Sequence, residues 1–78
     1  MQGSKLFVGN IDEAVSTDEL TEYFSYFGNV MYVNIFNGKG IAFVKMWNSA
    51  DAERAILGLN GIELKGRRIR VEKARPVK

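Results

Sequence analysis

The sequence predicts one α+β domain whose four strands and two helices follow the order β-α-β-β-α-β. Three observations favour this order. Two segments carry apolar residues at helical spacing, four others are apolar or alternating stretches typical of strands, and 78 residues leave room for one modest core. Right-handed crossovers place both helices on one face of a four-stranded antiparallel sheet, with the first and third strands at its centre. We expect the domain to span residues 4–75, with flexible termini at residues 1–3 and 76–78.

The first strand is expected at residues 6–10, an apolar stretch that ends in Gly-Asn. The first helix follows, because Ser16 and Glu19 have the spacing of a capping box, and it should end at Gly28. Its apolar stripe consists of Leu20, Tyr23, Phe24 and Phe27. The helix dipole favours negative charge in its first turns, which contain Asp18, Glu19 and Glu22.

Residues 30–36 and 39–46 are expected to form a β-hairpin around Asn37 and Gly38, because this pair tolerates the positive φ angles of a tight turn. The loop can have two residues or four, and both lengths sort the side chains onto the same faces. The face toward the helices then receives Val33, Ile35, Ala42 and Val44. Val30 is out of phase with this alternation, which predicts a bulge near the start of the strand.

The second helix is expected to begin at Asn48 or Ser49 and to end at Asn60. Its apolar stripe consists of Ala52, Ala55, Ile56 and Leu59. The last strand is expected at residues 69–73, with Ile69 and Val71 pointing inward. The whole arrangement is a ferredoxin-like sandwich, which many functions share.

Large apolar side chains are predicted on the face of the sheet that no helix covers. Phe7 alternates with the inward residues of the first strand, and Ile41 and Phe43 alternate with those of the third. Tyr32 and Lys45 fall on the same face. An exposed apolar patch predicts a partner, and aromatic rings with basic neighbours suit single-stranded nucleic acid.

Two segments resemble the sequence motifs of the RNA recognition motif family. Residues 6–11 (LFVGNI) match its hexamer, and residues 39–46 (KGIAFVKM) match most of its octamer. Because both motifs occur within the expected topology and the likeness covers about residues 4–75, the chain is identified as a member of this family. The resemblance implies a module that binds single-stranded RNA by stacking two or three bases on the sheet, within a larger protein of RNA processing or splicing.

The resemblance also implies roles for particular residues. Phe7 and Phe43 match the family's base-stacking rings, and Lys39 matches the basic residue that contacts a phosphate. The last-strand region that reads base edges corresponds to Arg70, Glu72, Lys73 and Arg75. The predicted RNA-binding site is completed by Asn10, Tyr32, Ile41 and Lys45.

One departure concerns Ile41, which stands where the family commonly has a third aromatic ring. Its absence predicts weaker binding or a different path for the strand. Three other aromatic residues are candidates to compensate: Tyr32, Phe36 and Trp47. The loop between the second and third strands is also short, so it offers few basic residues to hold RNA.

Charge is divided unevenly between the two halves of the chain. Residues 1–38 hold one base and five acids, a net charge of −4, whereas residues 39–78 hold ten bases and four acids, a net charge of +6. The basic half suits a polyanionic partner, and a solvated basic tail would have the same composition. The sequence has no cysteine and no histidine, so it lacks a disulfide framework, the usual general base and the commonest metal ligand. We therefore expect no enzyme activity, no metal and no cofactor.

The expected partner is single-stranded RNA, with single-stranded DNA as an alternative. The acidic first helix is compatible with a protein partner on the helical face, and the open sheet face with a protein-interaction or dimerisation function instead of RNA binding. No apolar run approaches the roughly 20 residues that span a bilayer, so we expect no membrane association. The remaining expectations are a monomer and an intracellular location, nuclear rather than cytoplasmic.

Overall fold

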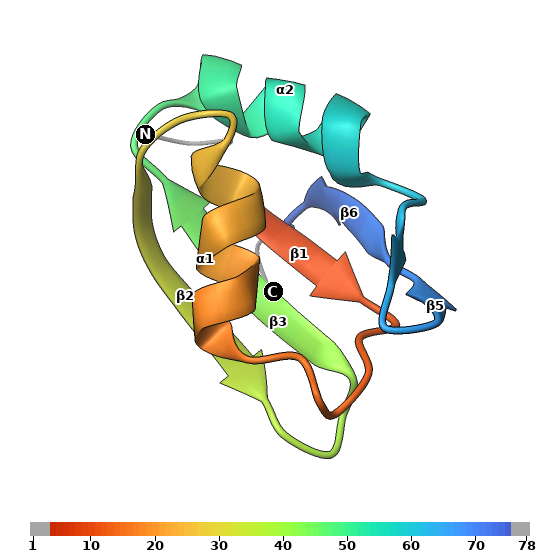
Figure 1. Ribbon diagram of the computed structural model, residues 1–78. Coiled ribbons are helices and arrows are strands. Elements are labelled where there is room, and N and C mark those ends of the chain that lie inside the picture. The colour runs from red at the N-terminus through yellow and green to blue at the C-terminus, as the bar shows by residue number, and fades with distance from the viewer. Residues whose placement is uncertain (1–3, 76–78) are drawn as a thin grey trace.

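A computed structural model of the protein describes residues 4–75, and the termini predicted to be flexible lie outside this range. One antiparallel sheet contains four strands: β1 (Lys5–Gly9), β2 (Val30–Phe36), β3 (Ile41–Met46) and β6 (Arg70–Lys73). Two helices, α1 (Thr17–Ser25) and α2 (Ser49–Leu59), lie on one face of this sheet (Figure 1). The strand order is β2-β3-β1-β6, which confirms the predicted fold and the central position of β1 and β3.

The two helices begin at capping residues that the sequence indicated. Ser16 Oγ accepts a hydrogen bond from Glu19 N at 3.1 Å, and Glu19 Oε1 accepts one from Ser16 N at 3.2 Å, which confirms the capping box. Of the two candidates for the start of α2, Asn48 is the N-cap residue, and its Oδ1 accepts a hydrogen bond from Asp51 N at 2.8 Å. Helix α1 ends at Ser25, before the predicted Gly28.

The β2–β3 connection is a four-residue loop. Phe36 lies opposite Ile41, so the two-residue alternative is excluded and β3 begins two residues later than predicted. The loop needs left-handed backbone at Gly38 (φ +82°) and Gly40 (φ +69°), on either side of Lys39. The register shifts between Val30 and Tyr32, which confirms the predicted bulge.

The hydrophobic core lies between the sheet and the two helices. Its largest buried side chains include Leu6, Val8, Leu20, Phe24, Val44, Met46, Ile69 and Val71. Small residues Ala52 and Ala55 of α2 are also fully buried, which lets this helix lie close to the sheet. Because the helices occupy this face, the strand residues of opposite parity are left on the other one.

A small hairpin precedes β6 and was not predicted. Its strands β4 (Glu63–Leu64) and β5 (Arg67–Arg68) have two residues each, and its turn contains positive φ angles at Lys65 and Gly66. Strands this short carry no measurable periodicity. Gly66 is a turn signal in the sequence, but nothing in the sequence pattern indicates the pairing of β4 with β5.

Candidate nucleic-acid interface

Three phenylalanine rings touch in a row on the face of the sheet that α1 and α2 leave uncovered. Phe7 of β1 lies opposite Phe43 of β3, and their ring centroids are 5.8 Å apart. Phe36, at the end of β2, places its ring 5.8 Å from Phe43 as well. The interplanar angles of 65° and 77° describe edge-to-face contacts, a geometry that aromatic pairs favour.

The alternation of side chains along β1 and β3 gives the rings their orientation. The strand neighbours of Phe7 and Phe43 are fully buried against the helices: Leu6, Val8, Ala42 and Val44. Phe7 and Phe43 therefore point the opposite way, and both remain partly accessible to solvent. Phe36 is 43% exposed. The two rings singled out in the sequence thus lie side by side on the open face.

Gly9 determines how closely the Phe7 ring approaches the backbone. A Cβ atom built at Gly9 would lie 3.0 Å from Phe7 Cε2 and 3.3 Å from Phe7 Cζ. Nearly any side chain at this position would therefore push the ring away from the strand. The glycine of the hexamer motif therefore allows the Phe7 ring to lie close to the backbone of β1.

Basic side chains surround the rings. Lys5 Nζ lies 5.0 Å from the centroid of the Phe43 ring, within the range of a cation–π contact. Lys45 lies opposite both Lys5 and Tyr32 in the register, so these three residues share the open face, where Tyr32 is 42% exposed. Lys5 was missing from the predicted site, although its place two residues before Phe7 puts it on the same face.

The last strand contributes a charged pair beside the rings. Arg70 lies opposite Gly9 and Glu72 opposite Phe7, and Arg70 Nη2 is 3.1 Å from Glu72 Oε2. Arg70 keeps further N–H donors and Glu72 a second carboxylate oxygen, so the pair can both donate to and accept from a nucleobase. Arg75 follows β6 and is exposed.

Two residues of the predicted site have other partners in the structure. Lys73 lies on the helical side of the sheet, where its Nζ is 3.0 Å from Oε2 of Glu53 in α2. Asn10 donates a hydrogen bond to Arg68 O at 2.8 Å and accepts one from Arg67 Nη1 at 3.0 Å. The structure therefore does not bring Lys73 to the rings, and it gives Asn10 the task of joining β5 to the end of β1.

A hollow of about 560 Å³ adjoins the rings where the β2–β3 loop meets the end of β1. Its lining includes Phe7, Phe36, Lys39, Ile41, Arg67 and Arg70. A backbone hydrogen bond from Ile11 N to Gly40 O, 2.9 Å long, holds the loop in this position. The hollow has Lys39 and two of the phenylalanine rings in its lining. A nucleotide could therefore place its base on a ring and its phosphate near Lys39.

Of the three residues proposed to replace the missing ring, Phe36 is the one that contacts Phe43. Ile41 lies opposite Phe36 in the register and is partly buried beside it. Trp47 is 61% exposed, and its backbone N donates to Asn29 O at 3.0 Å. Within residues 4–75, the ring contacts of the open face link only Phe7, Phe36 and Phe43.

Within residues 4–75 no cluster of acidic side chains is placed to hold a metal ion. None of the described helices has the length and apolar character needed to cross a membrane. The open face consists instead of aromatic rings, lysines and an arginine–glutamate pair on four adjacent strands. These features define a domain that binds nucleic-acid strands on a sheet surface.

The family assignment agrees with this geometry. The model of the RNA recognition motif family matches residues 6–70, and the chain belongs to this family. The match confirms the family and the class of function predicted from the sequence, an RNA-binding module.

Three comparisons illustrate the similarity. Polyadenylate-binding protein RBP45A of Arabidopsis thaliana is 44% identical over 66 residues, which cover 85% of this chain and 17% of that protein. A probable splicing factor, arginine/serine-rich 3, of Caenorhabditis elegans is 40% identical over 78 residues, covering 97% of this chain and 30% of that protein. The solved RNA recognition domains 1 and 2 of Sex-lethal from Drosophila melanogaster align with a TM-score of 0.88 at 30% identity, covering 94% of this chain and 50% of that one. This chain therefore spans less than a third of either curated relative.

Proposed function

We propose that this domain binds single-stranded RNA along its open sheet face, with bases stacked on Phe7 and Phe43 and phosphates contacted by the surrounding lysines. The observation that carries the proposal is the row of touching rings on the face that no helix covers. Every base has a π-face, so such rings accept bases without strict sequence preference. Each stacked base contributes about 1–3 kcal/mol of binding free energy.

Phe36 extends this stacking surface to a third ring. In the octamer motif the third aromatic position is occupied by Ile41, and Phe36 lies opposite it in β2. The third aromatic ring is therefore on β2 instead of at the octamer position on β3, and it contacts Phe43. We infer that a third base stacks nearer to β2 than the octamer alone would indicate, with Ile41 as apolar support.

Cationic side chains on the same face provide the contacts to phosphate. Lys5, Lys39 and Lys45 surround the rings, and each phosphate that they neutralise releases counterions from the RNA. Arg70 and Glu72 lie beside Phe7, where their free donors and acceptor face the edges of a stacked base. Arg75 extends this edge past the end of β6. The lysines give general affinity, and the Arg70–Glu72 pair gives what base preference there is.

The wider role follows the names of the relatives. One is called a polyadenylate-binding protein and another a probable splicing factor. These names support a role in RNA processing within a larger nuclear protein. We further propose that the domain acts as a monomer and by binding alone, without catalysis. Single-stranded DNA offers the same phosphates and, apart from thymine in place of uracil, the same bases, so contacts to the 2′-hydroxyl would favour RNA.

The double variant Phe7→Ala/Phe43→Ala tests the proposal. Losing two stacked bases removes about 2–6 kcal/mol, so the affinity for a fluorescent, randomised RNA should fall at least about 30-fold in an anisotropy titration. A DNA of the same design measures the preference between the two nucleic acids. Tyr26→Ala is the matched control, because this ring is 89% exposed on the chain segment that follows α1. A double variant that is folded by circular dichroism and binds as tightly as the wild type would disprove the proposal.

A further inference from the structure

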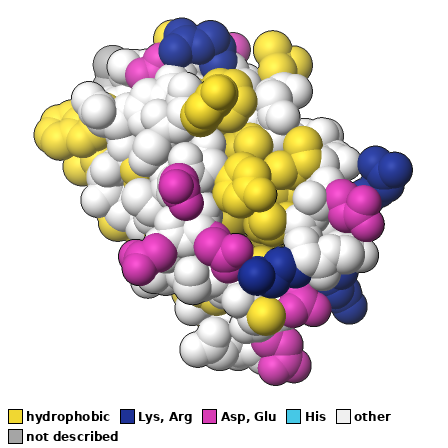
Figure 2. Space-filling model, in the orientation of Figure 1, with side chains coloured by type: hydrophobic (Ala, Val, Ile, Leu, Met, Phe, Trp, Pro, Cys, Tyr) yellow, Lys and Arg dark blue, Asp and Glu magenta, His cyan; other side chains and the backbone are white. Residues whose placement is uncertain are grey.

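A second exposed surface lies on the opposite side of the molecule, beside the two helices. A groove of about 470 Å³ is lined there by Glu19, Glu22, Tyr23, Tyr26, Phe27 and Leu59, and we call it the helical groove. Figure 2 shows this side of the protein, with hydrophobic side chains gathered at its centre and acidic side chains beside them. The open sheet face and its three phenylalanine rings lie on the other side of the sheet.

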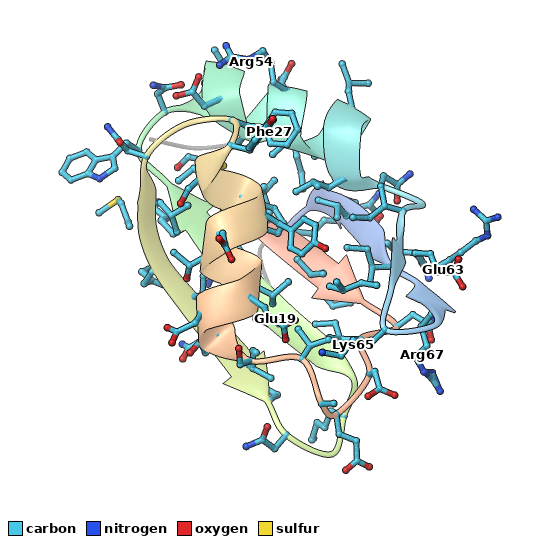
Figure 3. The ribbon with its side chains drawn as sticks, viewed as in Figure 1. Glu19, Phe27, Arg54, Glu63, Lys65 and Arg67 are labelled. Atoms are coloured by element: carbon cyan, nitrogen blue, oxygen red, sulfur yellow. The ribbon has the colours of Figure 1, made fainter. Side chains whose placement is uncertain are left out.

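One wall of the helical groove is built by Phe27, which packs against α2. The contact depends on Gly58, because a Cβ atom there would lie only 2.7 Å from Phe27 Cε1. Arg54 Nη2 donates a hydrogen bond to Phe27 O at 2.9 Å and is paired with Asp51 Oδ1 at 2.8 Å. Figure 3 shows Arg54 and Phe27 at the same end of the molecule. The Tyr26 ring meets Phe27 edge-on, with centroids 6.0 Å apart. These contacts fix the wall before any partner binds.

The two tyrosine rings of the groove are accessible to solvent. Tyr26 is 89% exposed and Tyr23 is 40% exposed, whereas Leu59 is buried and forms the floor. Neither tyrosine belongs to the hydrophobic core cluster, to which α1 contributes Phe24 and Leu20. Exposed rings around a preformed apolar floor are typical of an interaction surface.

The charge of the groove determines which partner fits it. Helix α1 carries no basic residue, and within residues 4–75 neither Asp18 nor Glu22 has an ion-pair partner. Glu19 is paired with Lys65, whose Nζ lies 3.3 Å from its Oε2; Figure 3 shows the two side by side. The rim therefore carries unneutralised negative charge, which repels RNA phosphates and attracts lysine or arginine.

We propose that the helical groove binds a basic peptide segment of another protein. One aromatic or leucine side chain of the peptide enters between Tyr23 and Tyr26 above Leu59, and a neighbouring lysine or arginine pairs with Glu22. The volume of about 470 Å³ suits one or two such side chains rather than a folded surface. Because the groove and the open sheet face lie on opposite sides of the sheet, the peptide and RNA bind at the same time.

The experiment selects short random peptides displayed on phage against the wild-type domain. We expect the enriched peptides to combine an aromatic residue or leucine with adjacent lysine or arginine, and to bind more weakly at high salt. The synthesised peptides should lose about tenfold in affinity with Tyr26→Ala and with Glu22→Lys. Glu63→Lys changes the net charge equally but lies on β4 outside the groove lining, so its effect should stay below about twofold. All three variants should keep the circular dichroism spectrum and the RNA affinity of the wild type.

Any of six results would overturn the proposal. The first two are a selection that enriches no peptide and a selection whose peptides lack basic residues. The next two are peptides that bind both groove variants as tightly as the wild type, and peptides that shift the NMR signals of the open sheet face instead of those of α1. The fifth is a dimer in sedimentation that Tyr26→Ala dissociates, which would make a second copy of this chain the occupant. The sixth is RNA that crosslinks to α1 rather than to β1 and β3.

Discussion

Replacing Phe36 with alanine tests whether a third stacking ring comes from β2. The ring is 43% exposed and touches Phe43 edge-on at 5.8 Å. Losing one base stack costs about 1–3 kcal/mol of binding free energy, which corresponds to about a 5- to 150-fold rise in Kd. The edge contact with Phe43 contributes about 0.5–1.5 kcal/mol to folding, a small part of the roughly 5–15 kcal/mol that stabilises a typical domain. The variant should therefore fold and bind weakly.

Two further substitutions separate stacking from packing at this position. Phe36→Tyr keeps an aromatic ring, and Phe36→Leu keeps apolar bulk without one. In an anisotropy titration with randomised RNA at fixed salt, Phe36→Tyr should bind like the wild type, whereas Phe36→Leu should lose nearly as much affinity as Phe36→Ala. Adding Ile41→Phe to Phe36→Ala should recover part of the loss, because residue 41 lies opposite residue 36. Wild-type affinity in Phe36→Leu would refute the stacking argument.

Three other predictions test the surrounding structure. Lys39→Ala should weaken binding to all sequences and reduce the slope of log K against log salt by about 0.7; an unchanged slope would exclude a phosphate contact. Lys45→Ala should lose more RNA affinity than Lys73→Ala, which removes the same charge from the helical side of the sheet, and equal losses would contradict this placement. Gly58→Ala should lower the free energy of unfolding by about 1–3 kcal/mol in thermal melts, despite the better helix propensity of alanine, because its Cβ would collide with the Phe27 ring. A melting temperature above that of the wild type would show that the ring yields freely.

The open face was predictable because side-chain alternation determines it. Phe7 and Phe43 sit between core residues on strands whose period is two, so their common orientation follows from the sequence. The bulge near Val30 was predictable for the same reason, as one residue out of phase needs one extra residue in the ladder. Local capping chemistry at Ser16 also sufficed to place the start of α1.

The parts that were missed depend on contacts between distant segments. Two- and four-residue loops after Phe36 place the same side chains on each face and differ only in the register of β2 against β3. The face pattern therefore could not show that the Phe36 ring reaches Phe43. The interactions of Asn10 depend on Arg67 and Arg68, more than fifty residues away, which belong to a hairpin without periodicity. Lys73 is a different case, because the alternation of β6 already assigned it to the inward face, and only the likeness to the family placed it in the site.

Nucleotides are expected to dock on the face of the sheet that carries Phe7, Phe36 and Phe43. The most direct measurement is an NMR titration of the domain with a randomised short RNA, followed in the aromatic and backbone signals. The ring signals of these three residues and the amides of β1 and β3 should shift together and saturate, while those of α1 and α2 stay in place. Shifts confined to α1 and α2, with the three rings unmoved, would contradict the account.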